Sequence, residues 1–192
     1  MPRRPGDDRR EEIITEAATL FARNGFHGTS MDDLGTAVGM SGPGLYRHFA
    51  GKEAILSQML IDISRRLLAG GQERVRQHQQ SRDNLAALVN FHVDFALDNP
   101  ELIDVQVRDS DAMSTEDQRT VRRLQAQYVG LWVEAIEQVW PHTSSATARA
   151  AAHAAFGLIN STPHSARLTR PEMSHLLQVM ATAGLEAASG VE

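Results

Sequence analysis

Four side chains that can donate hydrogen bonds stand close together near residue 46, directly after residues that discourage a helix. The segment reads GPGLYRHF over residues 42 to 49, and Lys52 follows three residues later. Phenol, imidazole and ammonium groups contact phosphate, and a guanidinium can contact phosphate or a guanine edge. These residue types therefore predict recognition of nucleic acid.

The spacing of residues 30 to 49 is that of two short helices joined by a tight turn. Leu34 falls on the inner face of the first helix, and Gly39 suits a turn that needs a left-handed backbone. Ser41 is placed as the N-cap of the second helix, so residues 42 to 44 fall in its first turn, where proline is tolerated. In a helix-turn-helix this turn faces the major groove. A plain helical hairpin with a charged surface would give the same pattern.

The rest of the chain repeats its apolar residues with the 3.6-residue period of a helix, and no segment alternates as a strand does. We therefore predict an all-α protein of about nine helices. The expected helices are 13–24, 31–38, 41–49, 52–79 with an interruption at Gly70-Gly71, 85–98, 101–108, 115–140, 145–161 and one that begins near Pro171.

Composition limits the classes of protein that fit. The 192 residues contain no cysteine, which excludes disulfides and thiolate metal sites. The N-terminus has no apolar region like that of a signal peptide, and the apolar runs are too short to span a bilayer. We expect a soluble, cytoplasmic protein.

The net charge of −5 is unevenly distributed. Basic and acidic side chains balance over residues 1 to 52, so the remainder of the chain carries all of the net negative charge. We predict a DNA-binding domain at 1–55 with an N-terminal basic arm, and a larger helical domain at 56–192.

Residues 29 to 56, TSMDDLGTAVGMSGPGLYRHFAGKEAIL, resemble the DNA-binding segment of the tetracycline-repressor (TetR) family of bacterial regulators. In that family a Gly–apolar–Ser turn leads into Leu-Tyr-x-His-Phe and then Lys-Glu. The residues that match in order and spacing are Gly39, Ser41, Leu45, Tyr46, His48, Phe49, Lys52 and Glu53. The resemblance is specific over residues 10 to 56, about a quarter of the chain.

The resemblance implies a homodimeric repressor that binds a near-palindromic double-stranded operator and responds to a small molecule in its C-terminal domain. It implies phosphate contacts for Ser30, Tyr46, His48 and Lys52, and base-facing positions for Gly42, Gly44 and Arg47. Ser41 and Pro43 complete the expected DNA-binding set. Many relatives have Ser or Thr where this chain has Gly44, so base reading here rests more on Arg47. The arm residues Arg3, Arg4, Arg9 and Arg10 either touch DNA or form a solvated tail.

The larger domain has polar and aromatic residues on otherwise apolar helix faces, as a small-molecule site does. The candidate ligand-binding residues are His92, Phe95, Tyr128, Trp132, His153, Phe156 and Asn160. Each of them could instead be an ordinary packed core residue. No two of the histidines lie four residues apart on one helix, so we expect no metal site, and we expect no cofactor. The ligand class stays open, with a hydrophobic acyl or aromatic compound as one candidate.

Two helices have the composition of a dimer interface. The helix at 145–161 is rich in alanine, which allows a second helix to approach closely. The last helix carries more apolar residues than one buried face needs, namely Leu176, Leu177, Val179, Met180, Ala183 and Leu185.

Two other functions remain open on the sequence. A helical enzyme could use His92 or His153 as a general base, although no nucleophile pairing or phosphate loop supports it, and we expect no enzyme. The larger domain could also dimerise without any ligand.

Overall fold

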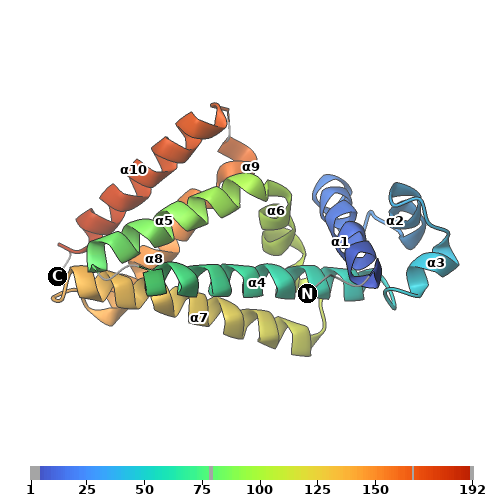
Figure 1. Cartoon of the computed structure of the whole chain (residues 1–192), viewed down its shortest axis with the longest axis horizontal. Coiled ribbons are helices and arrows are strands. Elements are labelled where there is room, and N and C mark those ends of the chain that lie inside the picture. Colours follow the sequence, from blue (N-terminus) through green and yellow to red (C-terminus); the bar gives the residue numbers. More distant parts are fainter. Residues whose placement is uncertain (1–4, 78–79, 166, 191–192) are drawn as a thin grey trace. The chain divides into compact units, whose positions relative to one another are not determined.

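A computed structural model describes residues 5–77, 80–165 and 167–190 (Figure 1). They form helices and connecting turns, and no strand occurs within these ranges. The helices are α1 (Pro5–Asn24), α2 (Met31–Ala37), α3 (Gly42–Tyr46), α4 (Lys52–Gln77), α5 (Ser81–Asp98), α6 (Pro100–Asp109), α7 (Thr115–Val139), α8 (Ser145–Ile159), α9 (Thr162–Ser165) and α10 (Arg170–Ala188), with a 3-10 turn at Ser110–Ala112. The predicted all-α fold is confirmed.

Every predicted helix is present, and the one-turn helix α9 was not predicted. Several boundaries differ from the prediction, among them the start of α5 at Ser81, and two of the differences affect the DNA-binding unit. The second helix of the helix-turn-helix ends at Tyr46, three residues early, because Arg47 is its C-cap and the chain turns at Arg47 and His48. Helix α1 begins at Pro5, so Arg9 and Arg10 belong to a helix rather than to an extended arm.

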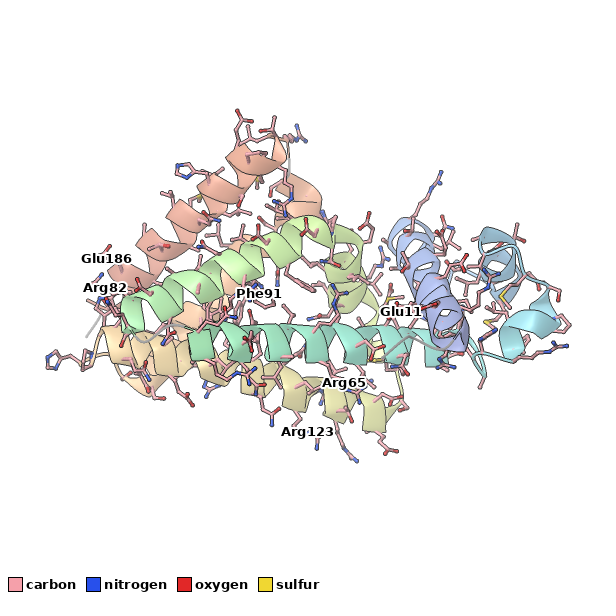
Figure 2. The ribbon with its side chains drawn as sticks, in the orientation of Figure 1. Glu11, Arg65, Arg82, Phe91, Arg123 and Glu186 are labelled. Atoms are coloured by element: carbon pink, nitrogen blue, oxygen red, sulfur yellow. The ribbon has the colours of Figure 1, made fainter. Side chains whose placement is uncertain are left out.

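The predicted interruption at Gly70-Gly71 is wrong, because α4 runs through both glycines. A Cβ atom on Gly70 would lie 2.2 Å from Cζ of Phe91, which Figure 2 labels on α5. A Cβ atom on Gly71 would lie 2.7 Å from Cε2 of Tyr128 on α7. These glycines therefore allow two aromatic side chains to pack directly against the backbone of α4.

The helices form two compact units. One comprises residues up to Ile63 together with 101–122, and the other comprises 64–100 together with 123 onward, so α4 and α7 contribute to both. The domain division at residue 55 stays a prediction.

In the first unit, the inner faces of α1 to α4 share one core. Ile13, Phe21, Leu34 and Leu45 are fully buried there. Leu34 and Leu45 join α2 and α3 to the same core, which fixes the two helices of the helix-turn-helix together. Leu45 therefore determines which residues of α3 point outward.

In the second unit, α10 packs against α5 and α8. The Arg170 guanidinium at the start of α10 lies 2.6 Å from the Asp98 carboxylate at the end of α5. Thr162 Oγ1 of α9 donates a hydrogen bond to the Ala96 carbonyl at 3.3 Å. These contacts join the C-terminal end of α5 to α9 and α10.

Within the described residues, no helix is long and apolar enough to cross a membrane.

Candidate nucleic-acid interface and effector site

The first helix of the helix-turn-helix begins with a reciprocal cap. The Asp33 backbone N–H donates to Ser30 Oγ at 3.1 Å, and the Ser30 N–H donates to the Asp33 carboxylate at 2.8 Å. The Ser30 hydroxyl also donates to this carboxylate at 2.6 Å, and these bonds lower the pKa of Asp33. Ser30 and Asp33 therefore form a capping box at the start of α2. A phosphate at Ser30 would have to compete with Asp33 for the hydroxyl proton.

The turn between α2 and α3 depends on two glycines. Gly39 has φ +64°, in the left-handed region that favours glycine. A Cβ atom on Gly35 would lie 2.9 Å from the carbonyl oxygen of Met40. The Met40 N–H donates a hydrogen bond to the Gly35 carbonyl at 2.7 Å, so the two residues are held close together. A larger residue at position 35 would separate the two helices.

Helix α3 presents most of the predicted DNA-binding residues at the surface. Ser41 is its N-cap and accepts a hydrogen bond from the Gly44 N–H at 3.3 Å, which leaves the Ser41 hydroxyl proton free to donate. Pro43, Tyr46 and Arg47 are exposed, with Tyr46 at 56%. Because Tyr46 and Arg47 leave a large apolar ring and a cation in water, this face is suited to a partner that carries negative charge.

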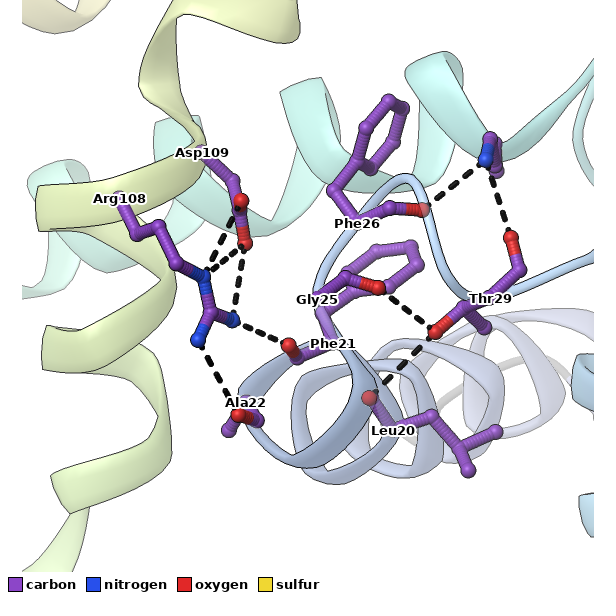
Figure 3. A network of polar contacts seen from close by, with 9 residues as sticks. Leu20, Phe21, Ala22, Gly25, Phe26, Thr29, Arg108 and Asp109 are labelled. Atoms are coloured by element: carbon purple, nitrogen blue, oxygen red, sulfur yellow. Dashed lines mark hydrogen bonds and ion pairs between the residues drawn. The ribbon is translucent and has the colours of Figure 1, made fainter.

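The predicted phosphate ligand Lys52 has structural contacts of its own. Its ammonium donates to the carbonyl oxygens of Phe26 at 2.9 Å and Thr29 at 3.0 Å, and it lies 4.6 Å from the centroid of the Phe26 ring. Figure 3 shows both carbonyl groups in the turn that follows α1. Lys52 therefore fixes the α1–α2 turn, with one ammonium proton left for another acceptor.

Arg108 on α6 binds two carbonyl groups in the last turn of α1. Its guanidinium donates to the carbonyl oxygens of Phe21 and of Ala22, and it pairs with the buried Asp109 carboxylate at 3.1 Å (Figure 3). A helix C-terminus carries unpaired carbonyls and partial negative charge, which a cation stabilises. Sequence reasoning missed this role, since Arg108 gives no signal beyond its place in the last turn of a helix.

Arg9 and Arg10 also hold the DNA-binding unit together. Arg9 donates to the Val38 carbonyl at 2.6 Å. Arg10 donates to the His48 carbonyl, and its Cζ lies 4.1 Å from the centroid of the Phe49 ring. These two arginines thus connect α1 to the segments around α3. The other predicted arm residues, Arg3 and Arg4, lie outside the described residues.

The second unit brings the predicted ligand-binding residues together. The ring centroid of His92 lies 5.7 Å from that of Tyr128, 5.9 Å from that of Trp132 and 4.8 Å from that of Phe156. Phe95 lies 6.5 Å from His92 on the same helix. His153 is exposed and meets the cluster only through Phe156, at 6.2 Å. We call His92, Phe95, Tyr128, Trp132, Phe156 and Asn160 the aromatic cluster.

Hydrogen bonds join three members of the aromatic cluster in a row. His92 Nδ1 lies 3.2 Å from the Tyr128 hydroxyl, and His92 Nε2 lies 3.2 Å from Asn160 Oδ1. Burial lowers the pKa of His92 to about 4, so its imidazole is neutral at pH 7. Because Asn160 Oδ1 can only accept, Nε2 carries the proton and Nδ1 accepts from the Tyr128 hydroxyl. Burial also raises the pKa of Tyr128, so this hydroxyl keeps its proton.

One polar atom of the cluster is left without a partner. Trp132 is fully buried, and its indole Nε1 makes no hydrogen bond to the described residues. Its contact with the Tyr128 hydroxyl lowers the pKa of Tyr128 against the larger effect of burial, so this hydroxyl is an acceptor within reach of the indole N–H. A buried N–H without an acceptor costs about 1–3 kcal/mol.

Among the described residues, no group of three His, Cys, Asp or Glu side chains could hold a metal ion.

Two family profiles match the chain, one in each part. The profile "Bacterial regulatory proteins, tetR family" matches residues 13–59. The profile "Tetracyclin repressor-like, C-terminal domain" matches residues 78–164. The first contains the helix-turn-helix, and the second contains all of the aromatic cluster.

Two curated relatives are similar over the N-terminal half. The transcriptional activator FasR of Mycolicibacterium smegmatis is 31% identical over 93 residues, 48% of this chain and 42% of that protein. The transcriptional repressor KstR2 of Rhodococcus jostii is 36% identical over 91 residues, 44% of this chain and 45% of that protein. The matched segment thus spans less than half the length of these relatives.

The solved structure of AibR in complex with isovaleryl coenzyme A and operator DNA has the same fold. It superposes with a TM-score of 0.75 and 19% identity, and the match covers 90% of this chain and 97% of that one. With a family profile matched in each part, a helix-turn-helix of the expected geometry and a shared fold, the chain belongs to the TetR family of bacterial transcriptional regulators, which are DNA-binding proteins and not enzymes.

Proposed function

We propose that this chain is a dimeric, ligand-responsive repressor that binds a near-palindromic operator and leaves it when a small molecule binds the aromatic cluster. The observation that carries the proposal is the exposed face of α3, where Tyr46 and Arg47 stand next to the Ser41 cap. Arg47 reads a base edge or a phosphate, and Tyr46, His48 and the spare proton of Lys52 contact phosphates.

Dimerisation is supported by the outer faces of α8 and α10. Leu176, Val179 and Met180 are between 40% and 52% exposed, while Leu177 and Leu185 of the same helix are buried. A groove of about 190 Å³ runs between the helices and is lined mainly by alanine, glycine, leucine and Met180. An isologous contact with a second copy would cover these apolar groups and place two α3 helices on one operator.

A ligand site in the aromatic cluster is supported by its composition. Buried rings, a neutral His92 and the unpaired Trp132 N–H together make an apolar site with a few polar groups. The similar protein AibR was solved with an acyl-coenzyme A ligand and operator DNA together. We infer that the effector favours the state of the dimer that binds DNA less well. Binding of the effector therefore weakens binding of the operator, and binding of the operator weakens binding of the effector.

The test uses an operator duplex recovered by selection and labelled with a fluorophore. Anisotropy would report its release from the full chain as fractions of a small-molecule extract are added. Release by a fraction that acts on the wild type but not on a Trp132→Phe variant supports the proposal. Tighter binding with the active fraction would show a co-repressor or an activator, as in the similar FasR, and would overturn the proposed sign of the response.

A further inference from the structure

The two acidic residues in the first turn of α2 have different surroundings. Three hydrogen bonds join Asp33 to Ser30 in the capping box. Asp32 is exposed, and its carboxylate makes no hydrogen bond or ion pair with a described residue, although its backbone carbonyl accepts from the Thr36 hydroxyl at 2.9 Å. Because Ser30 and Asp33 already cap the helix, the Asp32 carboxylate is available for another partner.

The Asp32 carboxylate lies against the first turn of α3. A Cβ atom on Gly42 would lie 3.2 Å from Asp32 Oδ1. Gly42 is the first residue of α3, directly after the Ser41 cap, and the first turn of the second helix of a helix-turn-helix faces base edges in the major groove. Asp32 therefore brings a carboxylate to the place where glycine leaves position 42 without a side chain.

A carboxylate in the major groove discriminates between bases because it can only accept hydrogen bonds. Guanine presents two acceptors there, O6 and N7, and thymine presents the O4 acceptor, so both repel it. Adenine presents the N6 amino donor beside the N7 acceptor, whereas cytosine presents the N4 amino donor alone. Cytosine is therefore the base that suits Asp32 best, and a phosphate is unsuitable.

Arg47 complements this carboxylate from the other end of α3. It is the C-cap of the helix, it is exposed, and it forms no ion pair with Asp32 or another described residue. A guanidinium binds the acceptors of guanine, and a carboxylate binds the donor of cytosine. The two free charges thus suit different base edges, and neither neutralises the other in this structure.

We propose that Asp32 is a specificity-determining residue of the operator interface, where its carboxylate accepts a hydrogen bond from the N4 amino group of a cytosine in each half-site. The inference rests on the proposed operator binding and adds a reader that stands on α2 instead of α3. It also gives a role to Gly42, since a larger residue there would crowd the carboxylate.

The test is selection of random duplex DNA on the full-length wild type and on Asp32→Asn in parallel. The wild type should enrich cytosine at one position of each half-site, and another base there should weaken binding about five- to thirtyfold. Asp32→Asn should enrich adenine at that position, because a side-chain amide accepts from N6 and donates to N7. Asp32→Ala should lose the preference without gaining another.

Asp33→Asn is the matched control, since it makes the same change one residue away within the capping box. It should lower the midpoint of thermal unfolding and keep the cytosine preference. Asp32→Asn should show the reverse, with the unfolding midpoint of the wild type and an altered base preference. A role of Asp32 in helix stability alone would move the midpoint and leave the preferred base unchanged.

The inference is overturned if the wild type and Asp32→Asn enrich the same bases. It is also overturned if both Asp32 variants bind all duplexes more tightly without a change in preference, because the carboxylate would then only repel phosphates. In both cases the enriched operator leaves the proposed function standing. If the wild type enriches no sequence, the proposed function itself fails, and the role of Asp32 fails with it.

Discussion

The ammonium of Lys52 lies 2.9 Å from the carbonyl oxygen of Phe26, and its charge also sits over the Phe26 ring. The resemblance to the TetR family implies a phosphate contact for this residue. Its position gives it a second role, which is to hold the turn between α1 and α2 against the start of α4. Both roles are compatible, because an ammonium has three protons and two are used within the chain.

Lys52→Met should lower the free energy of unfolding by about 1–3 kcal/mol, since it leaves two carbonyl oxygens without their charged donor. Urea denaturation measures the change. The control is Arg23→Met, which removes a cation from an exposed position on α1 and should stay within about 0.5 kcal/mol of the wild type. If the two variants are equally stable, the contacts of Lys52 do not stabilise the turn.

Substitutions on α3 should weaken DNA binding without affecting the fold, because Tyr46 and Arg47 are exposed. If Arg47 pairs with a guanine, Arg47→Ala should weaken the free energy of operator binding by about 1–3 kcal/mol and relax the sequence preference at one operator position. Tyr46→Ala should weaken binding to all sequences alike. Anisotropy with operator and scrambled duplexes distinguishes the two effects, and exposed Arg167→Ala is the control for loss of charge. An Arg47→Ala variant with wild-type affinity and preference would remove Arg47 from the interface.

Acid should destabilise the protein through His92. The pKa of His92 in the folded protein, about 4, lies below its ordinary value of 6.5. Between these two pH values the His92 imidazole is protonated in the unfolded chain and neutral in the folded protein. Stability from the neutral His92 is therefore complete above pH 6.5 and is lost as the pH falls toward 4, at about 1.4 kcal/mol per pH unit. His92→Gln should remove this slope from urea denaturation curves between pH 7.5 and 5. The control is His142→Gln at an exposed position, and equal slopes in wild type and His92→Gln would contradict the burial argument.

A charge on the outer face of α10 should separate the proposed dimer. Val179→Glu places a carboxylate among Leu176 and Met180, where a second copy would bury it without a partner. Sedimentation equilibrium should then give the mass of one chain instead of two, and operator affinity should fall sharply. Thr182→Glu puts the same charge on another exposed position of this helix and should leave the dimer intact. A wild-type mass that is already that of one chain would refute the interface.

The helical architecture could be predicted from the sequence because amphipathic periodicity and helix caps are local signals. Ser30, Gly39 and Ser41 act as their residue types predict. Gly70 and Gly71 misled the prediction, since a glycine that breaks a helix and a glycine that admits a neighbouring ring look the same in sequence. Only the position of Phe91 and Tyr128, far along the chain, distinguishes the two cases.

The members of the aromatic cluster were predicted from their helix faces, but their bonding was not. The row from Tyr128 through His92 to Asn160 joins residues 36 and 68 positions apart, and no local pattern encodes such pairs. The same is true of Arg108, which reaches carbonyls 86 and 87 positions earlier. His153 was expected among the ligand-binding residues and lies at the exposed edge of the cluster. Its role stays a prediction.

The most direct test of the central claim is selection of random duplex DNA on the purified full chain at about 150 mM salt, where weak phosphate binding is screened. The proposed dimeric repressor predicts an enriched near-palindrome whose half-sites lie about one helical turn apart. It also predicts that Arg47→Ala loses preference at one position in each half-site. Failure to enrich any sequence, at low salt and micromolar protein as well, would contradict sequence-specific operator binding by this chain.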